Sequence, residues 1–264
     1  MALPMSGSVK LSVQHLSKDF DGLQVLQDVS MEVAEGEFVC IVGPSGCGKT
    51  TFLRIICGLE SANGGAIQID GKAVSSPGAD RGFVFQADSL LPWRKVFNNA
   101  FIGLEVNGRT SAEDRSLTQK LLELVGLSGF ELYYPRQLSG GMRQRVNLTR
   151  ALAVNPEVLL MDEPFSGLDA QTREIMQTEL LRIWLEGRKT VIFITHQIDE
   201  AVYLADRVVV FARRPGRVQD IVPIDLPRPR QLSLKREPSF GPYVDRIWKM
   251  IERDVRESVL SGEE

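Results

Sequence analysis

Short, mainly apolar runs alternate with helical patterns through the second half of the chain. The runs lie at residues 158–161, 191–195 and 208–211, and helical patterns occupy residues 171–186 and 198–204 between them. A short continuous apolar run is typical of a strand that is buried on both faces. Strands that alternate with helices indicate βαβ units, so we predict an α/β fold with a mostly parallel sheet.

The N-terminal region has a different pattern. Apolar and polar residues alternate over residues 9–13 and 29–33, and the turn-forming residues Asp21 and Gly22 lie between these stretches. A further short strand pattern, at residues 66–69, is bracketed by glycine-containing turns. Alternation with a period of two predicts strands that bury one face. We therefore expect a partly antiparallel β subdomain beside the α/β core.

A helical region interrupts the strand pattern in the middle of the chain. Ser111 is a good N-cap for a helix that ends at Gly126, and a second helical pattern covers residues 141–154. Asn155 and Pro156 end this second helix. The pattern predicts a helical insertion within the α/β core.

These patterns divide the chain into three parts. We predict a core with its β subdomain from residues 1–86 and 156–230, and an inserted helical subdomain from residues 87–155. Residues 231–264 form a C-terminal connector and helix. The basic, proline-containing residues 228–238 are expected to be a solvated connector. The apolar stripe over residues 243–260 predicts a helix that packs on its own domain.

The composition excludes several classes of protein. Lys and Arg total 31 and Asp and Glu total 34, so the net charge of −3 argues against a chain that holds nucleic acid by bulk charge. The apolar runs are far shorter than the roughly 20 residues that span a bilayer, and residues 1–9 show no secretory signal. Three cysteines without paired spacing fit a reducing compartment. We expect a soluble cytoplasmic chain.

A glycine-rich loop follows the apolar run at residues 38–42. Gly43, Gly48, Lys49 and Thr50 satisfy the pattern G-x-x-x-x-G-K-[ST] between a buried strand and a helix. Glycines let backbone N–H groups surround phosphate oxygens, and the helix N-terminus adds partial positive charge. The pattern therefore predicts a nucleotide phosphate site.

Two more segments complete this chemistry. Asp162 ends a buried strand, where a charge is costly unless it meets a cation such as Mg²⁺, and Glu163 follows it in position to polarise an attacking water. Ser139, Gly140 and Gly141 start a helix and form a second anion site that the first does not need. A second half-site suggests that two chains face each other, each completing the other's nucleotide site.

With these residues the chain resembles an ATP-binding-cassette (ABC) ATPase, a P-loop NTPase, over nearly its whole length. Residues 43–50 and 158–163 are similar to the Walker A and Walker B motifs, and residues 138–144 are similar to the ABC signature. Gln86 matches the Q-loop and Asp169 matches the D-loop of this family. His196 matches its switch histidine, and Phe20 falls where the family has an aromatic residue that stacks on adenine. The resemblance implies an ABC ATPase core with an antiparallel β subdomain and a helical signature subdomain.

The resemblance also implies the residues of the site. Those that would bind nucleotide are Phe20, Gly43, Pro44, Ser45, Gly46, Cys47, Gly48, Lys49, Thr50, Thr51, Ser139, Gly140, Gly141 and Asp169. Those implied to be catalytic are Lys49, Gln86, Glu163 as general base and His196 as the γ-phosphate contact, and those that would hold Mg²⁺ are Thr50, Gln86 and Asp162.

The partners implied by the resemblance are a second copy or a homologous cassette, in a head-to-tail dimer that encloses two ATP–Mg²⁺. The resemblance also implies transmembrane permease subunits, to which this chain would bind as a peripheral protein at the cytoplasmic face of the inner (plasma) membrane. A periplasmic or extracellular solute-binding protein would be an indirect partner. Residues 43–49, 89–93, 213–217 and 225–230 look like the nitrate/sulfonate/taurine importer subfamily. This favours an importer of a small anion and predicts no nucleic-acid partner.

Several alternatives stay open at the level of sequence. The chain as a whole fits, less well, a soluble ABC ATPase with other partners, an exporter ATPase or an idle cassette. Phe20 and His196 can be ordinary core residues, and Trp93 can pack within the helical insertion instead of forming an exposed patch for a membrane subunit. Asn147 and Thr149, polar residues in the signature helix, are expected to be exposed or locally bonded.

Overall fold

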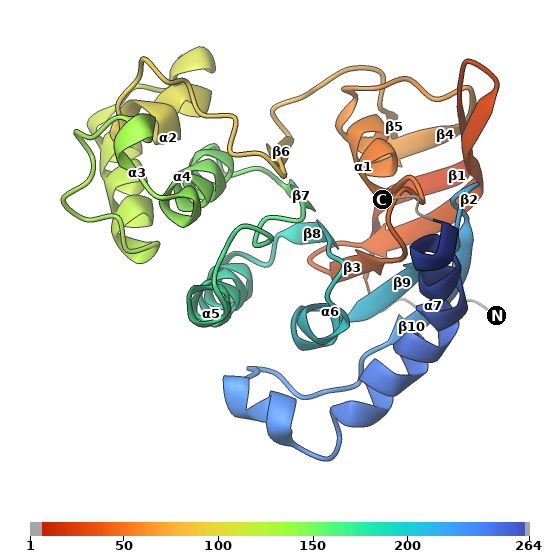
Figure 1. The fold of residues 1–264 in the computed structure, drawn as a ribbon. Helices are drawn as coiled ribbons and strands as arrows, with labels where there is room; N and C mark the ends of the chain where they lie inside the picture. The colour runs from red at the N-terminus through yellow and green to blue at the C-terminus, as the bar shows by residue number, and fades with distance from the viewer. Residues whose placement is uncertain (1–6, 262–264) are drawn as a thin grey trace. The chain divides into compact units, whose positions relative to one another are not determined.

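The computed structural model describes residues 7–261, and residues 1–6 and 262–264 lie outside the description. Contacts divide the chain into one unit of Met1–Gly78 with Gly187–Glu264 and a second unit of Ala79–Glu186. Each unit combines strands and helices, which confirms the α/β class (Figure 1). The domain boundaries expected from the sequence pattern remain predictions.

The first unit contains an antiparallel sheet with the strand order β2-β1-β4-β5. Its strands are β1 (Val9–Phe20), β2 (Leu23–Ala34), β4 (Gly64–Ile69) and β5 (Lys72–Ala73). The β1–β2 turn uses left-handed backbone at Asp21 and Gly22, with φ of 50° and 86°, which is why these residue types suit it. The prediction of a β subdomain here is confirmed, with longer strands than the alternating stretches indicated.

The same unit contains strands in the order β10-β9-β3-β8. These are β3 (Phe38–Val42), β8 (Thr190–Ile194), β9 (Arg207–Phe211) and β10 (Val218–Pro223). β3 pairs in parallel with both β8 and β9, and every residue of β3 and β8 is buried. The continuous apolar runs therefore form strands that are buried on both faces of this sheet, as predicted.

The helices of the first unit are α1 (Lys49–Cys57), α6 (Ile198–Leu204) and α7 (Gly241–Ser261). α7 contacts α6 and β9, and Ile247 and Ile251 on its apolar stripe are buried. The prediction that the terminal helix packs on its own domain is confirmed.

The second unit pairs two parallel strands with a helical layer. β6 (Arg81–Val84) lies beside β7 (Val158–Asp162). The helices are α2 (Val96–Val106), α3 (Ala112–Leu124), α4 (Gly140–Ala153) and α5 (Ala170–Gly187), with a 3₁₀ turn η1 (Pro135–Gln137). In Figure 1, α2, α3 and α4 lie side by side in yellow to green, and all three make mutual contacts.

A local cap explains where α3 begins, and a shared apolar cluster holds α2 against α4. Ser111 caps α3 through a reciprocal capping box, in which its hydroxyl accepts the backbone N–H of Asp114 and the Asp114 carboxylate accepts the N–H of Ser111. α2 and α4 bury Phe101, Leu104 and Ala153 in a shared apolar cluster. Both α3 and α4 were predicted, and their bounds agree within about two residues, the usual uncertainty of helix ends.

Three elements lack a clear sequence signal. α2 is more apolar than a surface helix, and β6 and β10 are short strands whose residues are mostly half-buried. Such segments have neither strict alternation nor a continuous apolar run, so periodicity does not identify them.

The expectation of a solvated connector at residues 228–238 is wrong for its first two arginines. Arg230 is only 6% exposed and donates to the carbonyl oxygens of Val202, Tyr203 and Ala205 at 3.1, 3.0 and 2.7 Å. Arg228 pairs with Asp206 at 2.8 Å. These guanidinium groups satisfy carbonyls at the end of α6, so the basic residues hold the connector against the domain.

Within the described residues, every helix is too short or too polar to cross a bilayer. Cys40, Cys47 and Cys57 are buried and belong to no disulfide among the described residues.

Candidate functional site

The glycine-rich loop lies between β3 and α1 in the first unit. Gly48 is the N-cap of α1 and has φ of 90°, a left-handed conformation that favours glycine. A Cβ at Gly48 would lie 2.8 Å from Cδ2 of Leu26, and a Cβ at Gly43 would lie 2.7 Å from the carbonyl oxygen of Phe211. No side chain caps α1, and its first turn contains no acidic residue. The helix therefore presents an N-terminus suited to an anion.

Lys49 has its ammonium group at the centre of this loop. Its Nζ donates to the carbonyl oxygens of Gly43 and Pro44, each at 2.8 Å, and lies 3.7 Å from Sγ of Cys47. Burial raises the pKa of the Cys47 thiol, although the Lys49 charge opposes this shift. Cys47 is thus a neutral thiol at physiological pH, and Lys49 supplies the positive charge of the loop.

The structure brings His196 to the same edge of the sheet as this loop. β3 and β8 are parallel neighbours, with Ile41 opposite Ile194, so the segments that follow them leave the sheet on one side. His196 comes two residues after the end of β8 and is exposed. Its alternative interpretation, a buried histidine of the core, does not fit this position.

Phe20 ends β1 and keeps 42% of its surface exposed. The interpretation of Phe20 as an ordinary core aromatic is therefore wrong. Its ring also lies over the ammonium of Lys18, with Nζ 4.5 Å from the ring centroid.

In the second unit, the end of β7 carries both predicted carboxylates. Asp162 is buried in the last position of the strand, and Glu163 follows it with a φ of 45°. A non-glycine residue in this region carries backbone strain, which concentrates at functional sites. Nε2 of Gln86 donates to Oε2 of Glu163 at 3.3 Å. The structure therefore brings together Glu163 and Gln86, which are far apart in the sequence.

The predicted second anion site lies at the N-terminus of α4. Ser139 is its N-cap, and the Ser139 hydroxyl accepts the backbone N–H of Met142 at 3.3 Å. Ser139 and Gly140 are exposed, and the first turn of α4 contains no acidic residue. Because the hydroxyl accepts from its own helix, its proton is available for an external acceptor.

Asp169 has a role that the sequence did not indicate. Its carboxylate accepts the backbone N–H of Thr172 at 2.9 Å at the start of α5, and this bond lowers the pKa of the Asp169 carboxyl. Asp169 is exposed. The residue therefore stabilises a helix N-terminus as it stands.

The comparison with protein families decides what these residues belong to. The family described as ABC transporter matches residues 26–166. The chain belongs to the ABC transporter family. It is an ABC ATPase, and the matched range contains the phosphate loop, Asp162–Glu163 and the Ser139 segment, which have the sequence patterns of the Walker A, Walker B and signature motifs.

Relatives resemble this ABC ATPase over most of their length. An uncharacterized ABC transporter ATP-binding protein of Methanocaldococcus jannaschii is 51% identical, with 95% of this chain and 94% of the relative covered. The taurine import ATP-binding protein TauB of Escherichia coli (strain K12) is 45% identical over 87% and 92% of the two chains. The nitrate import ATP-binding protein NrtD of Synechocystis is 44% identical over 95% and 99%.

A solved structure shows the same fold. The dimeric structure of MJ0796, a bacterial ABC transporter cassette, has a TM-score of 0.76 and 32% identity, with 82% of this chain and 99% of that chain covered. A second structure of that cassette is a post-hydrolysis state with ADP and Pi. The predicted P-loop ABC ATPase fold and the assignment as an ATPase are thus confirmed.

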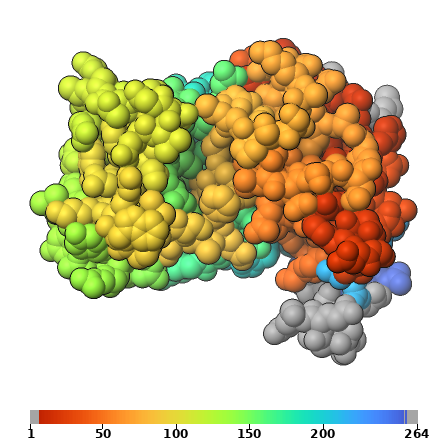
Figure 2. Space-filling view, turned by 90° about the horizontal axis from the view of Figure 1, so that it is seen from above, coloured from red at the N-terminus to blue at the C-terminus, as the bar shows by residue number. Residues whose placement is uncertain are grey.

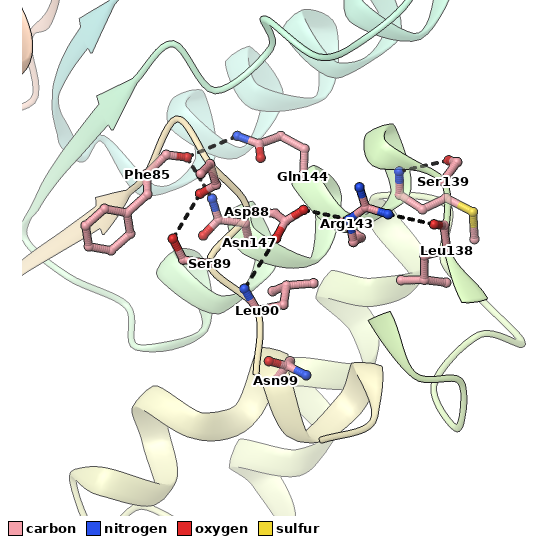
Figure 3. A network of polar contacts seen from close by, with 12 residues as sticks. Phe85, Asp88, Ser89, Leu90, Asn99, Leu138, Ser139, Arg143, Gln144 and Asn147 are labelled. Atoms are coloured by element: carbon pink, nitrogen blue, oxygen red, sulfur yellow. Dashed lines mark hydrogen bonds and ion pairs between the residues drawn. The ribbon is translucent and has the colours of Figure 1, made fainter. Parts of the chain in front are cut away.

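A polar network joins the Q-loop of this ABC ATPase to its signature helix (Figure 3). The Phe85 carbonyl accepts from Gln144 at 3.2 Å and from Asn147 at 2.9 Å, while Arg143 pairs with Asp88 at 2.6 Å. Every partner on the helix side comes from α4. The network couples the position of the Q-loop to the N-terminus that carries Ser139.

The expectation that Asn147 is exposed or locally bonded holds only in part. Its Oδ1 accepts locally from Arg150 at 2.6 Å, but Asn147 is fully buried and also donates to Phe85, 62 positions away. Thr149 fits the expectation, because its hydroxyl donates to the carbonyl of Arg145 one turn earlier. The signal that could have identified the network is the polar set at residues 143, 144 and 147, one turn of one helix.

Gly216 is a further residue that sequence reasoning missed. Its backbone bonds to Val25 and Gln27 of β2, and a Cβ on Gly216 would lie 2.0 Å from the carbonyl oxygen of Cys47. Only glycine allows this close approach to the Walker A loop. Residues 214–217, part of the stretch 213–217 noted in the sequence, thus pack against the Walker A loop at Cys47.

The segment after the Q-loop exposes an aromatic side chain. Trp93 is 70% exposed, whereas Leu90 is buried. Figure 2 shows the yellow part of this unit, the residues around α2, at the surface. The alternative that Trp93 packs within the helical insertion is wrong, and an exposed Trp is compatible with a partner surface.

Proposed function

We propose that this ABC ATPase is the ATP-hydrolysing subunit of an importer for a small anion, such as nitrate, a sulfonate or taurine. The observation that carries the proposal is its likeness, over most of both chains, to taurine and nitrate import ATP-binding proteins. A complete set of nucleotide motifs accompanies that likeness. An exporter or a soluble ATPase is the alternative, and no specific observation favours either.

Nucleotide binding rests on the Walker A loop. We assign the phosphates of ATP to residues 43–51, where every residue except Pro44 has a backbone N–H to donate, with the adenine on Phe20. When ATP binds, the ammonium of Lys49 would exchange the carbonyl oxygens of Gly43 and Pro44 for phosphate oxygens. These carbonyls already hold the ammonium beside the position that we assign to the phosphates.

Hydrolysis rests on Glu163 and His196. Glu163 accepts the proton of the attacking water, and the amide of Gln86 orients this carboxylate through its hydrogen bond. His196, exposed at the sheet edge, contacts the γ-phosphate. Catalysis of phosphoryl transfer consists mostly of positioning and charge stabilisation. Each of these groups therefore contributes to the rate by being held in place.

The residues assigned to Mg²⁺ fit that ion chemically. They are Thr50, Gln86 and Asp162, and all present oxygen atoms, the ligands that Mg²⁺ prefers. Nε2 of Gln86 faces Glu163, which leaves the amide oxygen as an acceptor. These residues would hold Mg²⁺, which would supply positive charge to the phosphate oxygens of the nucleotide.

The assembly we propose is a head-to-tail dimer. Ser139, Gly140 and Gly141 of one subunit would face the ATP held by the Walker A loop of the other, because the α4 N-terminus is exposed and uncompensated by acidic residues. Asp169 would lie near the same nucleotide. The dimer would bind permease subunits at the cytoplasmic face of the membrane. A periplasmic or extracellular solute-binding protein would be an indirect partner.

The test is to tag the chain in its native host, solubilise membranes gently and identify co-purifying proteins by mass spectrometry. Recovery of a multispanning permease and a solute-binding protein supports an importer, and the binding protein can then be screened with nitrate, sulfonates and taurine. Recovery of soluble partners alone contradicts the transport assignment and leaves the ATPase in place.

A further inference from the structure

A buried lysine lies near the end of β1. Lys18 is 7% exposed, and its Nζ donates to Oε1 of Glu60 and to the carbonyl oxygen of Ser61, each at 2.7 Å. Burying an ammonium is costly unless it is paired and hydrogen-bonded. The two acceptors, from the segment after α1, therefore fix the charge in one place.

The same ammonium contacts an aromatic ring. Nζ of Lys18 lies 4.5 Å from the centroid of Phe20, within the range of a cation–π interaction. Lys18 and Phe20 are two residues apart near the end of β1. The pairing of β1 with β2 is irregular on both sides of Lys18. Such bulges re-aim side chains at sheet edges and beside active sites.

The result is a ring that is held on one side and open on the other. Phe20 is 42% exposed, and a large exposed aromatic side chain has no packing neighbours that would fix its rotamer on the solvent side. The ammonium of Lys18, anchored by Glu60 and Ser61, supplies that constraint from the protein side.

We propose that Lys18 is a positioning residue that holds the ring of Phe20 for stacking against the base of a nucleoside triphosphate. This inference rests on the proposed function, in which Phe20 binds adenine. Lys18 acts through the ring and does not touch the phosphates. Its contribution therefore depends on the base and is absent for a ligand that has phosphates only.

The test compares two probes, a non-hydrolysable ATP analogue and inorganic tripolyphosphate, both with Mg²⁺. We expect Lys18→Met to weaken analogue binding about three- to tenfold, the size of a partly exposed cation–π contact. Tripolyphosphate affinity should stay within about twofold. In a Phe20→Ala background, Lys18→Met should have no further effect on the analogue. Titration calorimetry gives all of these constants.

The chain offers a matched control on the same strand. Lys10 is also a buried lysine with an ion pair, to Asp70 at 2.6 Å, but lies at the opposite end of β1 from Phe20. Lys10→Met should leave both affinities unchanged if it folds. Lys18→Arg should restore analogue binding, because Arg also places a cation on the ring. If Lys18→Met does not fold, Glu60→Gln loosens the ammonium and should give a smaller loss specific to the analogue.

Four results overturn the proposal and leave the ATPase assignment in place. They are equal losses for both probes, an unchanged analogue affinity in Lys18→Met, additive losses in the double variant, and an unchanged analogue affinity in Phe20→Ala. If the wild-type chain binds neither probe, the proposed function itself fails.

Discussion

Asp169 and Ser139 each hold the first turn of a helix while facing solvent. The Asp169 carboxylate accepts the N–H of Thr172, and the Ser139 hydroxyl accepts the N–H of Met142. A residue of this kind has a local structural task before any ligand arrives. Substitution to alanine therefore combines loss of a cap with loss of the proposed nucleotide contact, and isosteric variants are needed to separate the two.

Asp169 gives a pH-dependent prediction. Its bond to Thr172 lowers the pKa of the folded carboxyl, so its contribution to stability is complete above the unfolded pKa of about 4. The contribution is lost as the pH falls through the lower folded value. We expect Asp169→Asn, which keeps a capping acceptor, to lie between wild type and Asp169→Ala in urea midpoint at pH 7. The gap between wild type and Asp169→Asn should narrow as the pH falls below the unfolded pKa of about 4 and the wild-type carboxylate becomes protonated. A constant gap would contradict this.

Asn147 gives a prediction about stability. It is fully buried, donates to the Phe85 carbonyl at 2.9 Å and accepts from Arg150 at 2.6 Å. We expect Asn147→Leu to lower the free energy of unfolding by about 1–3 kcal/mol, because buried polar partners lose hydrogen bonds. Asn107→Leu is the control, since its bond to Gly103 is exposed. Equal urea midpoints for the two variants would contradict the prediction.

At the scale of elements, α6 depends on a residue outside it. The last carbonyls of this short helix accept from Arg230, and Leu204 accepts from Arg228 at 2.7 Å. Burial, with Arg228 beside it, lowers the pKa of Arg230 to about 10, so Arg230 stays charged at neutral pH. The connector is thereby part of the fold of the first unit.

We expect Arg230→Met to destabilise the protein by about 2–4 kcal/mol, because several buried carbonyl oxygens lose their donor at once. The measurement is equilibrium unfolding in urea followed by circular dichroism. Arg236→Met, an exposed arginine of the same connector, should change stability by less than about 0.5 kcal/mol. A small effect at Arg230 would mean that water satisfies these carbonyls equally well.

At the scale of the whole molecule, the proposed function depends on a second cassette. Glu163→Gln should bind ATP, form a dimer and lose about a hundredfold or more in kcat, because the amide cannot accept a proton. Light scattering after size exclusion, with and without ATP, measures the dimer, and phosphate release measures turnover. Glu157→Gln, an exposed change just before β7, is the control. Near-normal turnover in Glu163→Gln would remove Glu163 from the role of base.

Much of this molecule follows from short-range pattern. The buried runs at β3, β7, β8 and β9, the caps at Ser111 and Ser139 and the Walker A loop are local signals, because one period or one turn is enough to specify them. The motifs also sufficed for the family, which the comparisons confirm.

Contacts between distant residues were decided only by the tertiary structure. The bond from Gln86 to Glu163, the approach of Gly216 to Cys47, the burial of Asn147 and Arg230 and the ion pair of Lys18 with Glu60 each depend on how elements pack. A polar residue reads as exposed in a sequence because burying it is costly in isolation. Its partner, often many residues away, is what makes the burial favourable, and only the folded chain brings that partner into reach.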